Sequence, residues 1–181
     1  MGVEIERKFL VNREEFIAEI LGEQHRCYQI SQYYLNESTR IRREVHSNGE
    51  RKYYMTTKQK SSELSRIEVN VEIPVDLGEE LFNSFVSVPG ADGLGHISKT
   101  RYLTSFLPGQ KIDKPVAWEV DVFHNRNEGL IIAEIELQED ESFVVGMPPM
   151  VGEEITGDPR YYNAHLAQYP YKEWKNEGRQ E

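Results

Sequence analysis

Residues 4–11 read EIERKFLV, and their alternation of charged and apolar side chains is the pattern that decides the fold class. Side chains two positions apart in a β-strand project from the same face. Glu4, Glu6 and Lys8 therefore share one face, and Ile5 and Phe9 lie on the other. In a single strand, such alternation usually indicates an ordinary half-buried sheet. A more specific prediction comes from its recurrence along the chain.

Seven further segments carry the same alternation and are separated by turn-forming residues. The eight predicted strands cover about 2–11, 28–35, 38–46, 50–58, 64–74, 98–107, 115–124 and 129–138. Asn48-Gly49 and Pro108-Gly109 are typical turn dipeptides between strands. Because short connections join antiparallel neighbours, we expect a mostly antiparallel sheet.

Helices are predicted where the alternation stops. Asn12 with Glu15 resembles a capping box that opens a helix over about 13–21, and Asp76 with Glu79 does the same for about 76–86. Asp158 before Pro159 predicts the start of a helix that runs to about 168. A short helix is predicted near 140–146.

Charges recur on the predicted strands as like-signed pairs two residues apart. The acidic pairs are Glu4/Glu6, Glu119/Asp121 and Glu134/Glu136, with Glu68 and Glu72 on either side of Asn70; the basic pairs are Arg40/Arg42 and Lys99/Arg101. Charged residues are depleted in strands, and like charges on one face repel each other. We therefore expect bound ions to compensate: a divalent cation for the carboxylates and a phosphate-like anion for the basic side chains.

The fold class predicted from these faces is α+β: a closed antiparallel eight-stranded β-barrel with a polar, charged interior and a few flanking helices. A barrel of about eight strands leaves a tunnel that holds one small ligand. The outward faces are then apolar, and the amphipathic helices cover part of them. We expect a single domain over residues 1–170 and a charged, flexible tail over 171–181.

Composition excludes several classes of protein. The chain has 181 residues and a formal charge of −10, which argues against a broad nucleic-acid surface. It has no apolar run of the length that a membrane span needs, and its N-terminus lacks the apolar core of a secretory signal. Cys27 is the single cysteine, so we expect a reducing, cytoplasmic location. We expect no nucleic-acid or membrane partner, and a monomer or homodimer.

The motifs, taken in order, resemble those of the CYTH superfamily, also called the triphosphate tunnel metalloenzymes. EIERKFLV looks like the ExExK motif of that family. It is followed in the family's order by TRIRRE, MTTK, LSRIEVNVEI, SKTRY, WEVDVF, AEIEL and GEEITGDPRYYNAHLA. The resemblance extends from about residue 3 to 168 and is strongest to the short bacterial branch that is similar to inorganic triphosphatases.

This resemblance implies roles for individual residues. By analogy, the metal ligands are Glu4, Glu6, Glu68, Asp121, Glu134 and Glu136, and the metal is Mg²⁺ or Mn²⁺. The residues that bind the phosphate chain are Lys8, Arg40, Arg42, Lys58, Lys99 and Arg101. The catalytic residues are Lys8, Tyr34, Lys99 and Glu119. One position departs from the family pattern, because Asn70 stands where members often carry an acidic residue.

The implied reaction is attack by water on the terminal phosphorus of a triphosphate. Such transfer depends on positioning and charge neutralisation more than on covalent chemistry. Glu119 or Glu68 could position the water, or a partly neutral lysine, Lys8 or Lys99 beside Tyr34, could accept its proton.

We expect a divalent-metal-dependent hydrolase that acts on inorganic triphosphate or a related triphosphate compound. The same scaffold also supports class IV adenylyl cyclases and thiamine triphosphatases, so fold alone does not fix the reaction. A polyphosphate- or nucleotide-binding module is the non-enzymatic alternative. It explains the acidic pairs poorly, because carboxylates near an anion help only when a metal bridges them.

Overall fold

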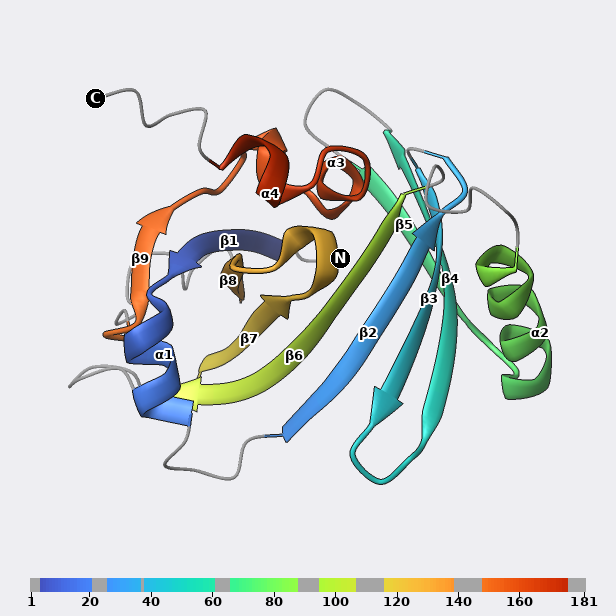
Figure 1. Ribbon diagram of the computed structural model, residues 1–181, viewed down its shortest axis with the longest axis horizontal. Coiled ribbons are helices and arrows are strands. Elements are labelled where there is room, and N and C mark those ends of the chain that lie inside the picture. Colours follow the sequence, from blue (N-terminus) through green and yellow to red (C-terminus); the bar gives the residue numbers. More distant parts are fainter. Residues whose placement is uncertain are drawn as a thin grey trace. The chain divides into compact units, whose positions relative to one another are not determined.

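The computed structural model describes residues 4–20, 26–36, 38–60, 66–87, 95–106, 116–138 and 148–175 (Figure 1). The chain divides into two compact units. The first comprises Met1–Cys27, Thr100–Phe123 and Gly129–Asp158, and the second comprises Tyr28–Lys99, His124–Glu128 and Pro159–Glu181. Among the described residues, no helix has the length and apolar character needed to cross a membrane. The helix expected near 140–146 lies outside these residues.

All eight predicted strands are confirmed, and a ninth is present. The strands are β1 (Glu4–Val11), β2 (Arg26–Tyr34), β3 (Thr39–His46), β4 (Arg51–Lys60), β5 (Arg66–Ile73), β6 (His96–Phe106), β7 (Val116–Phe123), β8 (Ile131–Gln138) and β9 (Val151–Glu154). The strand pairs whose register is described are antiparallel, as expected. The prediction missed β9 because its four residues, VGEE, show no apolar alternation.

The expectation of a closed eight-stranded barrel is wrong. The described strands form one nine-stranded sheet in the order β5-β4-β3-β2-β6-β7-β8-β1-β9, so β5 and β9 are its two ends. Closure of eight strands would require β1 to pair with β5. Instead, the outer edge of β1 pairs with β9, with Phe9 opposite Glu154 and Val11 opposite Val151.

The first unit contains the charged strand faces of β1, β7 and β8, and its core lies on their apolar faces. Phe9 and Trp118 are buried there with ring centroids 5.8 Å apart. Phe16 from α1 (Arg13–Ile20) joins the same cluster. The predicted cap of α1 is confirmed, because Asn12 Oδ1 accepts hydrogen bonds from the backbone N–H groups of Glu14 and Glu15. The amphipathic helix thus covers apolar strand surface as expected.

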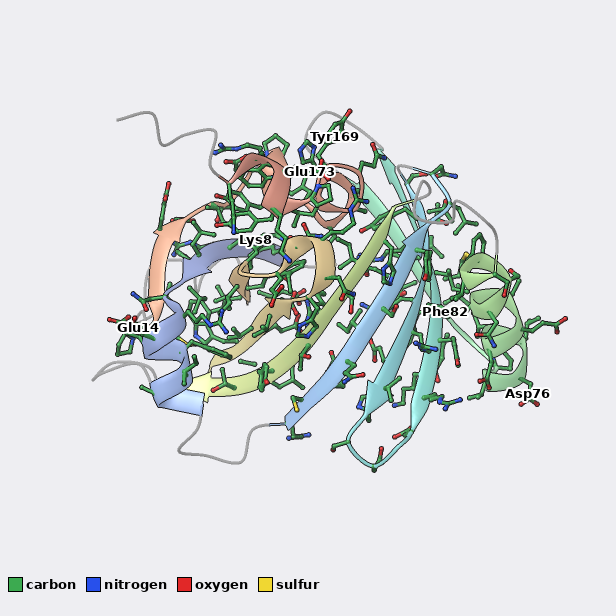
Figure 2. The ribbon with its side chains drawn as sticks, in the orientation of Figure 1. Lys8, Glu14, Asp76, Phe82, Tyr169 and Glu173 are labelled. Atoms are coloured by element: carbon green, nitrogen blue, oxygen red, sulfur yellow. The ribbon has the colours of Figure 1, made fainter. Side chains whose placement is uncertain are left out.

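The second unit packs α2 (Val75–Val86) against β3 and β4 (Figure 1). Phe82 projects from α2 toward these strands, whereas Asp76 lies at its exposed end (Figure 2). The Phe82 ring contacts Tyr33 at 5.3 Å and Tyr53 at 6.2 Å between centroids. The predicted cap by Asp76 is wrong, since Pro74 is the N-cap and Asp76 lies within the first turn.

The helix predicted from Asp158 to about 168 is broken into two short pieces, and a third short helix follows it. These are η3 (Pro159–Tyr161), α3 (Asn163–Gln168) and α4 (Tyr171–Trp174), with Pro170 before the last. The buried Asn127, in η2 (Asn125–Asn127), joins two of them. Its Nδ2 donates to Leu166 O at 3.1 Å, and its Oδ1 accepts from the backbone N–H of Tyr171 at 2.7 Å.

Gly78 sets how closely α2 approaches β4. A Cβ at this position would lie 2.4 Å from both Cβ and Cγ of Tyr53, which is fully buried. Helix propensity alone predicts that Gly78→Ala stabilises the protein by about 1 kcal/mol. We expect the opposite sign, a loss of about 1–3 kcal/mol, because the packed helix must move outward. Urea unfolding checks this, with Asn83→Ala on the exposed face of α2 as the control; a stabilised Gly78→Ala would contradict the close approach.

Candidate functional site

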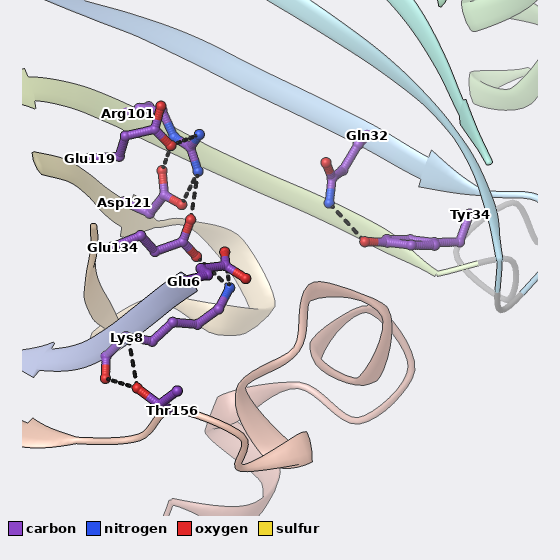
Figure 3. A network of polar contacts seen from close by, with 9 residues as sticks. All are labelled: Glu6, Lys8, Gln32, Tyr34, Arg101, Glu119, Asp121, Glu134 and Thr156. Atoms are coloured by element: carbon purple, nitrogen blue, oxygen red, sulfur yellow. Dashed lines mark hydrogen bonds and ion pairs between the residues drawn. The ribbon is translucent and has the colours of Figure 1, made fainter. Parts of the chain in front are cut away.

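The charged face of the first unit gathers seven of the predicted site residues. Glu6 and Lys8 lie on β1, Arg101 on β6, Glu119 and Asp121 on β7, and Glu134 and Glu136 on β8, of which all but Glu136 are drawn in Figure 3. The register explains the grouping: Lys8 and Glu119 are both opposite Glu134, and Glu6 is opposite Glu136. Strand alternation and antiparallel pairing together therefore bring these side chains to one face.

Arg101 forms the centre of this group. Its Nε and Nη2 donate to the two carboxylate oxygens of Asp121, each at 2.7 Å. Two other carboxylates accept hydrogen bonds from the same guanidinium. Nη1 donates to Glu119, and Nη2 donates to Glu134 at 3.2 Å. Asp121 is 0% exposed and Arg101 is 9% exposed. Burial disfavours the charged guanidinium, but the three carboxylates outweigh this effect and raise the pKa of Arg101 well above its usual value.

Glu134 connects Arg101 to Lys8. One of its carboxylate oxygens accepts from Arg101, and the other accepts from Lys8 Nζ at 2.8 Å (Figure 3). Lys8 Nζ also lies 3.0 Å from a carboxylate oxygen of Glu6. Burial lowers the pKa of Lys8, but attraction by Glu134 and Glu6 outweighs it, so the pKa is raised. Lys8 is therefore protonated at neutral pH in this arrangement, unlike the partly neutral lysine considered from the sequence.

The backbone of Lys8 is held by residues that the sequence reasoning missed. Its N–H donates to Thr156 Oγ1 at 3.0 Å, and its carbonyl oxygen accepts from the N–H of Ile155 at 2.8 Å. Thr156 follows β9, which shows no strand alternation. The family motif GEEITGDPRYYNAHLA includes Thr156, but the sequence assigned no role to it.

Among the described side chains in contact on this face, carboxylates outnumber cations. Lys8 and Arg101 are the two cations, and Glu6, Glu119, Asp121 and Glu134 are the four carboxylates that contact them. Glu6 and Glu136 are directly opposite each other, an arrangement that destabilises an antiparallel pair when the charges are alike. Carboxylate oxygens are the donors that Mg²⁺ and Mn²⁺ prefer. The donor chemistry therefore fits a divalent cation.

The described side chains do not form a ready-made cation site. No three acidic, histidine or cysteine side chains among them converge as metal ligands would. The four carboxylates that contact Lys8 and Arg101 are turned toward these basic groups instead: Asp121 and Glu119 toward Arg101, Glu6 toward Lys8, and Glu134 toward both. The backbone of Glu4 lies in β1 opposite Gln138.

The second unit holds the other predicted site residues. Tyr34 on β2 is opposite Arg40 on β3, and Arg42 is opposite Gln32, so these four share one face. The hydroxyl of the buried Tyr34 accepts a hydrogen bond from Gln32 Nε2 at 3.1 Å. Lys99 on β6 is 3% exposed. The backbones of Lys58 and Glu68 are opposite each other on β4 and β5.

Two further polar residues on this face were missed, although the alternation could have indicated them. Gln32 lies two positions before Tyr34, and Glu44 lies two positions after Arg42. Arg42 Nε is 3.2 Å from a Glu44 carboxylate oxygen, and the Arg42 guanidinium lies over Tyr54 at 4.9 Å. Asn70, the departure from the family pattern, accepts a hydrogen bond from Thr56 Oγ1 at 2.8 Å.

Comparison with known proteins identifies the family. The CYTH domain model matches residues 2–156, most of the chain. The chain belongs to the CYTH domain family. This confirms the resemblance inferred from the motifs.

Proteins similar to this chain include two that are named inorganic triphosphatase. One, from Acetivibrio thermocellus, is 37% identical over 175 residues, which cover 97% of this chain and 99% of the relative. The other, from Nitrosomonas europaea, is 36% identical over 166 residues, which cover 91% of this chain and 96% of the relative. The crystal structure of the inorganic triphosphatase NE1496 aligns with 93% of this chain and 96% of its own, with a TM-score of 0.57 and 30% identity.

The buried pair of Arg101 and Asp121 should dominate the stability of this CYTH unit. Arg101→Met leaves a fully buried carboxylate without its partner, so we expect a loss of about 3–5 kcal/mol in the free energy of unfolding. Asp121→Leu costs less, because Glu119 and Glu134 still contact Arg101. The double variant should lose less than the sum of the two, as chemical denaturation of all three will show. Arg51→Met, which removes an exposed ion pair with Glu79, is the control; purely additive losses would contradict the coupling.

The raised pKa of Lys8 sets the direction of a pH effect on stability. A lysine whose folded pKa lies above its unfolded value of about 10.4 stabilises the fold below that pH and loses the effect as pH rises toward the folded pKa. The advantage of wild type over Lys8→Met in unfolding free energy should be constant from pH 7 to about 9 and should fall above about 10.4.

Denaturant unfolding at several pH values measures this difference. Lys172→Met is the matched control, because Lys172 forms an exposed ion pair with Glu128. An advantage of wild type over Lys8→Met that grew above pH 10.4 would have the wrong sign for a lysine held by Glu134 and Glu6.

Proposed function

We propose that this CYTH protein is a divalent-metal-dependent hydrolase that removes the terminal phosphoryl group of inorganic triphosphate. The observation that carries the proposal is the face on which Lys8 and Arg101 are embedded among carboxylates, with Glu6 directly opposite Glu136. A pure anion-binding module gains nothing from that excess of carboxylates. The names of the two similar inorganic triphosphatases support the choice of substrate.

We assign Mg²⁺ or Mn²⁺ first to Glu4, Glu6 and Glu136. Glu6 and Glu136 are opposed across the β1–β8 pair, and Glu4 lies two positions before Glu6 on the same strand. Asp121 and Glu134 complete the acidic set, and their contacts with Arg101 and Lys8 support a role in orienting those two cations. Glu68 is included by the family resemblance. When bound, the metal supplies Lewis-acid polarisation of the phosphoryl oxygens.

The basic residues bind and neutralise the phosphate chain in this proposal. Lys8 and Arg101 are held as full cations by their carboxylate partners, so both remain charged while the substrate changes charge. Family resemblance supports the same role for Arg40, Arg42, Lys58 and Lys99. Because phosphoryl transfer depends mainly on positioning and electrostatics, cations such as Lys8 and Arg101 can provide much of the catalysis.

Glu119 is the residue that we assign to orient the attacking water. It is half-buried on the charged face and is itself oriented by a contact with Arg101 Nη1. The raised pKa of Lys8 argues against that lysine as the proton acceptor. Lys99, with Tyr34, is the alternative acceptor, and it predicts an alkaline optimum of activity.

We also propose that residues 1–170 act as one functional unit, with 171–181 as an appendage. The family match over residues 2–156 supports this, because it includes parts of both compact units. A cytoplasmic location is proposed from the single cysteine, which is typical of a reducing compartment.

A substrate panel tests the activity. Purified protein is incubated with triphosphate, pyrophosphate, ATP and thiamine triphosphate, each with Mg²⁺, Mn²⁺ or chelator, and phosphate and cyclic AMP are measured. We expect phosphate release from triphosphate that requires metal. Formation of cyclic AMP from ATP would instead indicate an adenylyl cyclase. Preferred cleavage of thiamine triphosphate would indicate a thiamine triphosphatase. Tight binding of triphosphate without turnover would indicate a binding module.

Charge-removing variants test the metal assignment. Glu6→Gln and Glu136→Gln should each lower metal-dependent kcat/KM by about 100-fold or more, because the loss of a metal contact costs a few kcal/mol in the transition state. Glu136→Gln should leave stability unchanged or higher, since it relieves repulsion between opposed carboxylates. Glu6→Gln relieves the same repulsion but also removes the ion pair with Lys8, so its net effect on stability should be small. Glu153→Gln, on the exposed part of β9, is the matched control. Full turnover by Glu6→Gln would remove Glu6 from the metal site.

A further inference from the structure

A polar cavity lies within the second compact unit, and apart from Lys99 its lining consists of residues that the proposed reaction does not use. Its volume is about 290 Å³, near the lower end of the range for small-molecule sites. The polar side chains of its lining belong to Gln29, Ser31, Arg43, Ser98, His124 and Asn125. None of the residues that line it in the described structure is acidic, although the chain as a whole has 31 acidic residues.

The cavity opens on the opposite face of β2 and β3 from the proposed phosphate-binding arginines. Ser31 is opposite Arg43 in the β2–β3 register, whereas Tyr34 is opposite Arg40 and Gln32 is opposite Arg42. Side chains alternate between faces, so Ser31 and Arg43 project away from Arg40 and Arg42. Lys99 also borders the cavity, but alternation directs its side chain to the face opposite that of Ser98. The cavity is therefore distinct from the proposed active site.

Arg43 supplies the positive charge of the cavity and is held in a fixed orientation. Its guanidinium lies over the ring of Phe82 on α2, 4.4 Å from the centroid. Its Nε is buried and has no hydrogen-bond partner within the described structure. A buried donor without a partner costs free energy that a ligand can recover, and a planar guanidinium suits phosphate oxygens.

Ser31 and the loop after β7 complete a set of hydrogen-bonding groups. Ser31 Oγ is 2.8 Å from His96 Nε2, and the His96 ring stacks on Tyr33 at 4.5 Å. A hydroxyl can accept one hydrogen bond and donate another, so Ser31 can serve His96 and a ligand together. The backbone N–H of His124 donates to Ser98 O at 2.9 Å, which fixes the loop that carries Asn125 at the rim.

We propose that this cavity binds a small phosphate-bearing anion, at a site separate from that of the triphosphate. The guanidinium of Arg43, with its buried donor, can bind phosphate oxygens together with two serine hydroxyls and side-chain amides. The described residues of the lining include no carboxylate that would repel such an anion. Inorganic phosphate and a small phosphomonoester share this chemistry. The inference does not rest on the proposed hydrolase activity.

Amide chemical shifts test the proposal directly. Isotope-labelled protein is titrated, without divalent metal, with inorganic phosphate or with glycerol phosphate to about 20 mM, enough to saturate a site whose Kd is about 1 mM. Chloride at matched ionic strength controls for screening. We expect saturable shifts at the amides of Ser31, Ser98 and Asn125. The probe that produces them distinguishes free phosphate from an ester as the source of the phosphate group.

Substitutions in the lining test whether the chemical-shift changes come from binding in the cavity. Arg43→Gln should raise Kd at least tenfold, and Arg51→Gln, which removes the same charge from an exposed ion pair on β4, should leave it within twofold. Asn125→Gly suits the left-handed backbone at φ 57° and should weaken binding several-fold, even if Arg43→Gln does not fold. The absence of saturable shifts with both probes, or unchanged affinity in both cavity variants, overturns the proposal. Shifts at Lys8 and Glu134 report the other site separately.

Discussion

The buried ion pair of Arg101 and Asp121 is the interaction on which the charged face of the first unit depends. A fully buried carboxylate is tolerated only when a strong partner satisfies it, and Arg101 does so with two parallel hydrogen bonds. The same guanidinium also contacts Glu134, whose second oxygen holds Lys8. One buried pair thereby orients a chain of charged groups that extends across β6, β7, β8 and β1.

These contacts explain how the like-signed charge pairs in the sequence are partly compensated within the protein. Within β7 and β8, neighbouring carboxylates on one face do repel, but cations from β1 and β6 are interleaved among them. Internal compensation therefore accounts for part of what a bound metal was expected to do. Among the described residues, Glu6 is still directly opposite Glu136, and four carboxylates contact two cations. The opposed Glu6 and Glu136 are the place where a divalent ion is proposed.

Local patterns in the sequence were sufficient to predict the strands and to predict which side chains share one face of a strand. Alternation gave all eight long strands, and it correctly placed Lys8, Glu119 and Glu134 on one side, because the period of a strand is a local property. The edges of the sheet depend on long-range pairing instead. Four residues of β9 occupy the outer edge of β1, and nothing in VGEE indicates that pairing. The support of Lys8 by Thr156 was missed for the same reason.

The second unit shows that both faces of one strand pair can carry polar function. Arg40 and Arg42 lie on one face of β3, and Arg43 on the other, where it stacks on Phe82 instead of being covered by aliphatic side chains. A simple division into a charged face and an apolar face would place only packing residues beside α2. The apolar contacts of Phe82 with Tyr33 and Tyr53 do hold the helix there. The same apolar cluster extends to Ile41 and Ile73. Beside it, the cavity combines Ile30 and Val45 with hydroxyl, amide and guanidinium groups, and this mixed lining is what supports the proposed second anion site.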